Sequence, residues 1–402
     1  METIDKAKSM TVQWMVLLAA SAIAVGARAE GPLVKSSAVA PSVPSKVRLA
    51  HVPLNDVTAI AAQKGWLQEE FAKYNAKADL VVTSSYGSSG SVAALFDRGD
   101  LHFVPLMMNM SLQFRAQGLD TVVVWGSTPV NPRRAATIVL DDSTIHSVAE
   151  LKGKTLASSV LGCPYYASME ALRNQGVTVD NDLRKGDVRF INISGIAATS
   201  AFLAGSFQAY AMHPASATTA SLYIQKQARE LTEAVPNGVY VNSGGRSMHF
   251  ASRVWANENP DLVRAYLTAW DRTVRWIAAD HGAHMEEAAT ITARALRLPK
   301  AVALFDIKDP STVAWNWGET DYNALVAAMK RYQAYQISVG DPFFTKFHLN
   351  DKQIEALVDK RFFAGGEYFV DVSESRQHSA SAEPAAKVPA GKKIALLSAS
   401  SR

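Results

Sequence analysis

The chain has 402 residues, of which 48% are hydrophobic and 19% are charged, enough for a large core and for two lobes. Its formal net charge of +4 is too small to indicate nucleic acid as a partner. Cys163 is the one cysteine, so an intrachain disulfide, a thiolate-rich zinc site and an iron–sulfur cluster are all excluded.

Residues 1–29 have the pattern of an export signal. Lys6 and Lys8 precede an apolar run at 12–25, and the small-x-small sequence Ala27-Arg28-Ala29 is a cleavage site. A membrane anchor is the alternative, but the run is shorter than the ~20 residues that span a bilayer. We therefore predict a signal peptide at 1–29, a Ser-, Pro- and Ala-rich flexible linker at 30–46 and a periplasmic mature protein.

Between residues 47 and 140, short apolar segments alternate with amphipathic ones. They predict strands at 47–51, 80–83, 101–106, 121–125 and 136–140. Helices are expected at 57–74, 92–98 and 111–116, with a polar loop at 86–91. Strands that alternate with helices indicate an α/β fold with a mostly parallel sheet.

The segment 151–177, LKGKTLASSVLGCPYYASMEALRNQGV, organises the middle of the chain. It predicts a strand at 154–159, a loop at 161–163 and a helix at 165–174. Pro164 suits the first turn of this helix, and Gly176 suits its end. The free N–H groups at the start of such a helix attract an anion.

The second half of the chain becomes increasingly helical. Strands are predicted at 187–193, 208–212 and 245–252, and helices at 196–204 and 217–229. After residue 260, four amphipathic helices at 262–279, 285–295, 321–335 and 351–360 have apolar stripes, which we interpret as packing against a sheet. Because Ser, Ala, Lys and Pro dominate the end of the chain, we expect residues 372–402 to be disordered.

Motifs for nucleotide binding and catalysis are weak, and we expect no cofactor and no metal. Residues 153–155, GKT, resemble the end of a P-loop, but Val148 stands where a glycine is needed and a strand follows. Cys163 could be a nucleophile with His213 as its base, although a small residue lining a pocket is the favoured interpretation. Arg134 either is solvated at the surface or faces an anion.

Five segments in order carry a family resemblance: KGWL at 64–67, GSSGS at 87–91, ALFDRGDLHF at 94–103, SVAELKGK at 147–154 and NPDLV at 259–263. Together they resemble the periplasmic substrate-binding proteins of the nitrate/sulfonate/taurine class of ABC importers. The same superfamily includes the thiamine-pyrimidine synthases. The resemblance covers about residues 47–300.

The resemblance implies a two-lobed periplasmic binding protein fold of type II. Lobe I would be 47–140 and 241–371, lobe II would be 141–240, and two strands would form the hinge. The ligand would lie in the cleft between the lobes, at the C-terminal ends of strands. The expected ligand-binding residues are Asn55, Ser88, Ser89, Met107, Arg134, Gly162, Cys163, Tyr165, Tyr166 and His213.

The expected function follows from this fold. We predict a monomeric protein that captures a small organic anion, such as a sulfonate, a sulfate ester or an aromatic carboxylate. It would deliver this ligand to the membrane subunits of an ABC importer and bind no nucleic acid. The methionines at 107, 108 and 110, together with Tyr165 and Tyr166, suggest a ligand with an apolar or aromatic body.

Two departures from the superfamily bear on enzymatic activity. The cysteine-rich motif of the thiamine-pyrimidine synthases is absent. Desulfinases of this fold place a catalytic cysteine in the loop after the first strand, where this chain has PLND at 53–56. We therefore expect a binding protein and not an enzyme, with a Cys163-dependent desulfinase or hydrolase as the alternative.

The export signal makes a direct prediction about the mature protein. Its N-terminal residue, determined by terminal sequencing of protein from the cell envelope, should lie at or near Glu30. An abundant cytoplasmic form that retains Met1 would remove the argument for export.

Overall fold

The structure of the protein is a computed structural model that describes residues 45–51, 57–82, 89–127, 137–179, 185–212, 217–231, 247–308 and 317–372. The predicted signal peptide and the tail from residue 373 lie outside these ranges. So does the predicted linker, apart from its last two residues, which begin the first strand. Within these ranges, none of the helices combines the length and the hydropathy that a membrane span requires.

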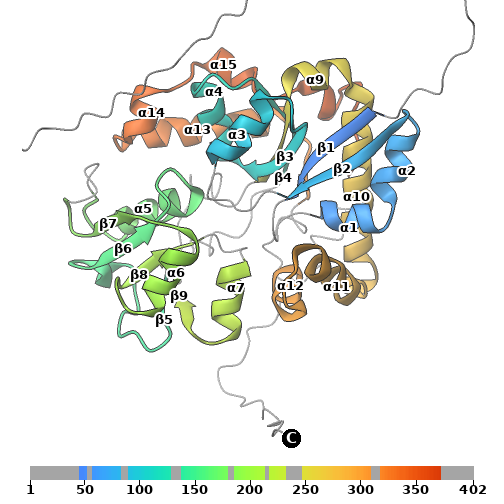
Figure 1. Cartoon of the computed structure of the whole chain (residues 1–402). Helices are drawn as coiled ribbons and strands as arrows, with labels where there is room; N and C mark the ends of the chain where they lie inside the picture. Colours follow the sequence, from blue (N-terminus) through green and yellow to red (C-terminus); the bar gives the residue numbers. More distant parts are fainter. Residues whose placement is uncertain are drawn as a thin grey trace, which may run out of the picture. The chain divides into compact units, whose positions relative to one another are not determined.

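Two β-sheets form the framework (Figure 1). The first has the order β11-β4-β10-β3-β1-β2 and the second the order β7-β6-β8-β5-β9. The strands of the first sheet are β1 (Ser45–His51), β2 (Ala76–Val82), β3 (Phe103–Met107), β4 (Thr121–Ser127), β10 (Ser247–Ser252) and β11 (Trp317–Glu319). Those of the second are β5 (Thr137–Leu140), β6 (Thr155–Ser158), β7 (Arg189–Asn192), β8 (Ala209–Ala211) and β9 (Ala228–Glu230).

Both sheets are mixed, whereas the sequence predicted mostly parallel sheets. In the first, β10 runs antiparallel to β3 and β4; in the second, β5 runs antiparallel to β8 and β9. The chain passes from β4 to β5 through 128–136 and returns from β9 to β10 through 232–246. The strands that follow these two passages, β5 and β10, are the ones that run antiparallel to the neighbours named above. The predicted hinge falls largely on these two segments, outside the described residues.

Helices flank both sheets, which confirms the predicted α/β class. The helices that follow strands of the first sheet or lie in the C-terminal part are α1 (Thr58–Gln63), α2 (Trp66–Ala72), α3 (Ser89–Asp97), α4 (Met108–Ala116), α9 (Arg253–Glu258), α10 (Pro260–Gly282), α11 (Met285–Leu296), α12 (Lys300–Ile307), α13 (Tyr322–Ser338), α14 (Pro342–Lys346) and α15 (Asp351–Glu355). The second sheet carries α5 (Cys163–Asn174), α6 (Gly195–Leu203) and α7 (Ala217–Ile224).

Three predicted elements differ from the structure. The helix predicted at 57–74 is two helices, because Gly65 adopts φ +79° between α1 and α2. The helix predicted at 217–229 ends at Ile224, and residues 228–230 pair with β5 as a strand. The helix predicted at 351–360 is confined to Asp351–Glu355, and a separate 3-10 turn begins at Lys360.

The strand at 137–140 belongs to a different sheet from the one that was predicted. The expected lobe boundary after residue 140 grouped it with the first lobe, yet β5 is hydrogen-bonded only to β8 and β9 of the second sheet among the described strands. Its apolar sequence fits either sheet equally well. Only tertiary pairing decides its place, and local sequence does not encode that pairing.

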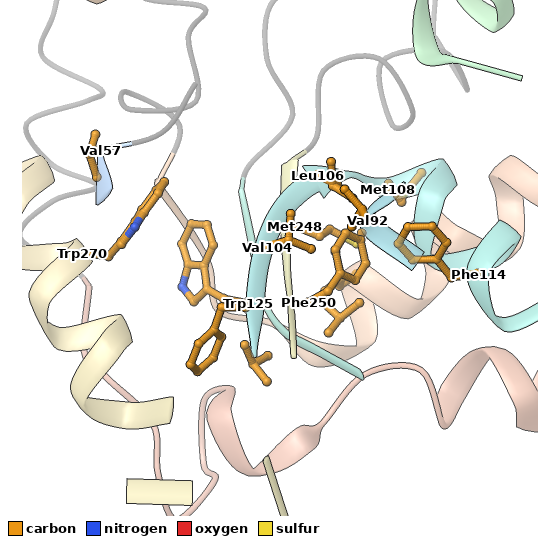
Figure 2. Close-up of a cluster of buried hydrophobic side chains, with 14 of the residues drawn as sticks. Val57, Val92, Val104, Leu106, Met108, Phe114, Trp125, Met248, Phe250 and Trp270 are labelled. Atoms are coloured by element: carbon orange, nitrogen blue, oxygen red, sulfur yellow. The ribbon is translucent and has the colours of Figure 1, made fainter. Parts of the chain in front are cut away.

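Alternation along the strands gives each sheet two apolar faces. In the first sheet, Val104 of β3 pairs with Phe250 of β10 and Leu106 pairs with Met248. Figure 2 shows these side chains beside Phe114 of α4. The intervening residues turn the other way, where Phe103 stacks on Tyr266 of α10 and His249 contacts Trp270.

The second sheet shows the same alternation, with a separate cluster on each face. Val139 and Leu156 belong to the large core that also contains the first sheet's side chains. Their neighbours Ile138 and Ala157 belong to a smaller core with residues of α6 and α7, among them Phe202.

Helix α5 is enclosed. Every residue from 165 to 172 is buried. On the sheet side, the Tyr165 ring lies 5.8 Å from that of Phe190 in β7. On the other side, the Tyr166 ring lies 6.0 Å from both Tyr332 of α13 and Phe344 of α14. A helix without a solvent-facing side depends on its neighbours for stability.

This packing predicts unequal effects of two phenylalanines near the end of α14. Phe344 is 0% exposed, so Phe344→Ala should lower the free energy of unfolding by about 3–5 kcal/mol. Phe347 is 42% exposed, and Phe347→Ala should change it by no more than about 0.5 kcal/mol. Denaturant unfolding followed by circular dichroism measures both. Equal effects would show that α14 does not cover α5 as described.

Candidate functional site

Two helices begin shortly after the C-terminal end of a strand, one strand in each sheet. Strand β3 runs directly into α4, whose N-cap is Met107. Strand β6 leads through a short turn into α5, whose N-cap is Gly162. Both N-caps have extended backbone, and neither helix start receives a side-chain cap from the residues that the structure describes. The predicted order of strand, loop and helix at 154–174 is confirmed, although the helix begins at Cys163.

The turn before α5 is tightly held. The Gly162 N–H donates to the Ser159 carbonyl at 3.1 Å, and Leu161 between them adopts φ +70°. Two side-chain amides of α4 donate to the carbonyl oxygen of Leu161, Asn109 at 3.3 Å and Gln113 at 3.1 Å. These bonds bring the starts of α4 and α5 together.

The turn before α5 and the first turns of α5 differ in their exposure to solvent. Residues 159–164 are partly exposed, whereas Met107, Tyr165 and Tyr166 are buried. The expected role of these three side chains was to contact the apolar body of a ligand. The structure instead packs both tyrosine rings into the core. We therefore assign these rings to packing, and the backbone at the start of α5 remains as the accessible part.

Six of the ten expected binding residues can be placed in the fold. Besides Met107, Gly162, Cys163, Tyr165 and Tyr166, Ser89 is the first residue of α3. Asn55, Ser88, Arg134 and His213 lie outside the described residues, so their role remains a prediction.

The electrostatics around α5 disfavour a reactive cysteine. Burial raises the pKa of the Cys163 thiol to about 12, although the residue as a whole keeps some exposure. Burial also raises the pKa of the Tyr165 hydroxyl to about 12 and, together with the nearby Asp341, raises that of Tyr166 well above its usual value. Cys163 is therefore a neutral thiol at physiological pH, and a neutral thiol is a poor nucleophile.

Asp341 belongs to the framework and not to a catalytic pair. Its carboxylate accepts from the N–H groups of Phe343 and Phe344, each at 3.0 Å, and so caps α14. Its burial raises its pKa. In the described part of the chain, no group of three or more His, Cys, Asp or Glu side chains could hold a metal ion.

Asn109 and Gln113 are the residues that sequence reasoning missed. They lie four positions apart and so share one face of α4, where Met108 and Leu112 are also buried. Two amides in a buried helix were the available signal. The helix was predicted to begin at 111, which placed Asn109 in a loop. The spacing of four residues between Asn109 and Gln113 was therefore not recognised as one face of a helix.

The fold and the site geometry define the class. The chain has the periplasmic binding protein fold, two mixed sheets flanked by helices, shared with the alkanesulfonate-binding protein SsuA from Xanthomonas axonopodis pv. citri bound to MOPS. That structure superposes with a TM-score of 0.61 at 16% identity, over 79% of this chain and 99% of SsuA. The chain belongs to the NMT1/THI5-like family, whose match spans residues 58–282.

Two further proteins are similar. An Escherichia coli (strain K12) protein named as an aliphatic sulfonates-binding protein is 26% identical over 222 residues, which are 55% of this chain and 62% of that protein. The match thus spans less than two thirds of the relative's length. A mutant of the desulfurization enzyme DSZB in complex with biphenyl-2-sulfinic acid has the same fold, with a TM-score of 0.55 at 16% identity over 83% of this chain and 99% of DSZB.

The buried thiol makes stability depend on pH. The folded state holds the Cys163 proton up to about pH 12, whereas an ordinary thiol loses it near 9.0. The folded state therefore binds more protons between these values, and the free energy of unfolding falls as pH rises through this window. Measured from about pH 8 to about pH 10.5, the stability of the wild type relative to Cys163→Ser should decline. A constant difference would mean that the thiol is solvated.

Proposed function

We propose that this chain is a solute-binding protein, which captures a small organic anion where α4 and α5 begin. The observation that carries the proposal is the meeting of two helix starts that lack side-chain caps, joined through the Leu161 carbonyl. Helix starts present N–H groups and the positive end of the helix dipole, and both attract negative charge. The N–H groups and the helix dipole can therefore attract an anionic group even where the two helix starts supply no charged side chain.

The chemistry of the α5 start sets what it can hold. Pro164 has no N–H, so the donors of the first turn are those of Cys163 and Tyr165. We infer that a sulfonate, a sulfate ester or an aromatic carboxylate uses these donors. Asn55, Ser88, Ser89, Arg134 and His213 are proposed to complete the site. Neutral donors suit reversible capture, because a desolvated ion pair is costly to form.

The biological setting is inferred from relatives. The Escherichia coli relative is named for binding aliphatic sulfonates, and SsuA for binding alkanesulfonates. We propose that this chain acts as a periplasmic monomer and delivers its ligand to the membrane subunits of an ABC importer. The two chain crossings between the lobes, near 133–140 and 239–247, are proposed to act as the hinge.

An enzyme on the same fold is the alternative, favoured by the likeness to DSZB. Cys163 would then be the nucleophile. Its raised pKa and its position at the start of α5, outside the loop after β1, speak against this role. Cys163→Ser separates the two functions, because a binding protein keeps its affinity whereas an enzyme loses turnover.

Gly162 allows a charge to be placed at the proposed site. An aspartate at an N-cap accepts from the N–H of the third helical residue, here Tyr165, so Gly162→Asp should occupy the donors that a ligand needs. It should lower anion affinity by about 10-fold or more, the equivalent of a hydrogen bond to a charged group, without lowering the melting temperature. The control is Gly162→Ala, whose Cβ meets the Ser159 carbonyl oxygen at 3.1 Å without adding charge.

The measurement has two stages. A thermal-shift screen with butanesulfonate, MOPS, an aryl sulfate, benzoate and nitrate identifies the ligand, since a ligand that binds only the folded state raises the melting temperature. Calorimetry with that ligand then compares wild type, Gly162→Asp and Gly162→Ala. Equal affinity in all three would place the binding site away from the start of α5.

A further inference from the structure

We infer that Asn109 and Gln113 are positioning residues, which hold the start of α5 in its binding geometry by donating to the Leu161 carbonyl. This inference rests on the proposed function, in which the start of α5 receives the anion. Neither residue needs to touch the ligand. Their role is to fix the backbone that does.

Leu161 has a conformation that a side chain disfavours. Its φ of +70° lies in the left-handed region, where the Cβ crowds the backbone. Glycine is the usual residue at such a position in a turn, but the glycine of this turn is Gly162, one residue later. The surroundings must therefore hold Leu161 in place.

The buried side-chain amides of Asn109 and Gln113 stabilise this conformation of Leu161. Asn109 is 0% exposed and Gln113 is 3% exposed, and a buried amide is costly unless it forms hydrogen bonds. Both donate to the same carbonyl oxygen, which has two lone pairs to accept them. They come from successive turns of one face of α4.

A second contact holds the opposite side of the turn. The Val160 N–H donates to Asn192 Oδ1 at 3.1 Å, at the end of β7. The turn is thus fixed between α4, which follows the first sheet, and β7 of the second sheet. Loss of the α4 amides would free one side, and Leu161 could relax toward an ordinary conformation.

Such relaxation would rotate the peptides that follow, including those that lead to Cys163 and Tyr165. Cys163 lies two residues beyond Leu161 and is the one cysteine in the chain. Burial raises the pKa of its thiol, while the residue as a whole is partly exposed. Its rate of reaction with N-ethylmaleimide under native conditions therefore reports the geometry of the turn without any ligand.

The experiment compares Gln113→Met with wild type. Loss of one buried hydrogen bond should raise the rate of Cys163 modification and lower the affinity for MOPS, each by about 2- to 10-fold. Adding Leu161→Gly, which permits the left-handed conformation, should bring the rate in Gln113→Met back to within about threefold of wild type. If Gln113 only filled space in the core, adding Leu161→Gly would not restore the rate of Cys163 modification. Asn109→Leu removes the other donor and replaces Gln113→Met if the latter fails to fold.

Gln333 provides the matched control. It is also a buried amide that bonds to backbone, donating to the Leu349 carbonyl and accepting from the Leu349 N–H, both at 2.8 Å. Gln333→Met should lower stability yet leave the Cys163 rate within about twofold of wild type. If Gln113→Met changes neither rate nor affinity, or if Gln333→Met changes the rate equally, the positioning role is overturned. If wild type does not bind MOPS but the rates behave as expected, the positioning role stands and MOPS is not a ligand.

Discussion

The enclosure of α5 is the constraint on which the rest of the site depends. One side of the helix packs on the second sheet, through Tyr165 and Phe190, and the other packs on α13 and α14, through Tyr166. With both sides covered, the helix is exposed only at its two ends: at Cys163 and Pro164, which continue the partly exposed turn before it, and at Arg173 and Asn174. The helix therefore offers its end and not its side, and a helix end is the part that carries unsatisfied N–H groups.

Leaving those groups without a cap is costly. An N-cap side chain is worth about 1 kcal/mol, and a left-handed residue other than glycine costs about 1–2 kcal/mol. Three α-helices in the described part of the chain take such a cap, from Asp321 on α13, Asp341 on α14 and Asn350 on α15, whereas others, such as α6 and α10, start without one. The α5 start is instead held from outside, by Asn109 and Gln113. Burial of the helix body offsets the cost.

Local signals in the sequence predicted the elements well and their partners poorly. Pro164 and Gly176 marked the helix that became α5, because each acts through its own backbone. The sheet of the strand at 137–140 and the strand at 228–230 depend on pairing between distant segments. Tyr165 and Tyr166 were expected at a ligand because they follow a strand end. Which side of the helix becomes covered was decided by α13 and α14, more than 150 residues away in the sequence.

The continuous core has a consequence for the way the protein unfolds. Val139 and Leu156 of the second sheet lie in the same buried cluster as Val104 and Phe250 of the first. Disrupting either sheet exposes apolar surface that the other also uses, so the two sheets are coupled into one cooperative unit. The smaller cluster around Phe202 and Tyr210 is separate from this unit. Partial opening should therefore begin at α6, which supplies Ala198 and Phe202 to this smaller cluster, and leave the starts of α4 and α5 intact until the whole core is lost.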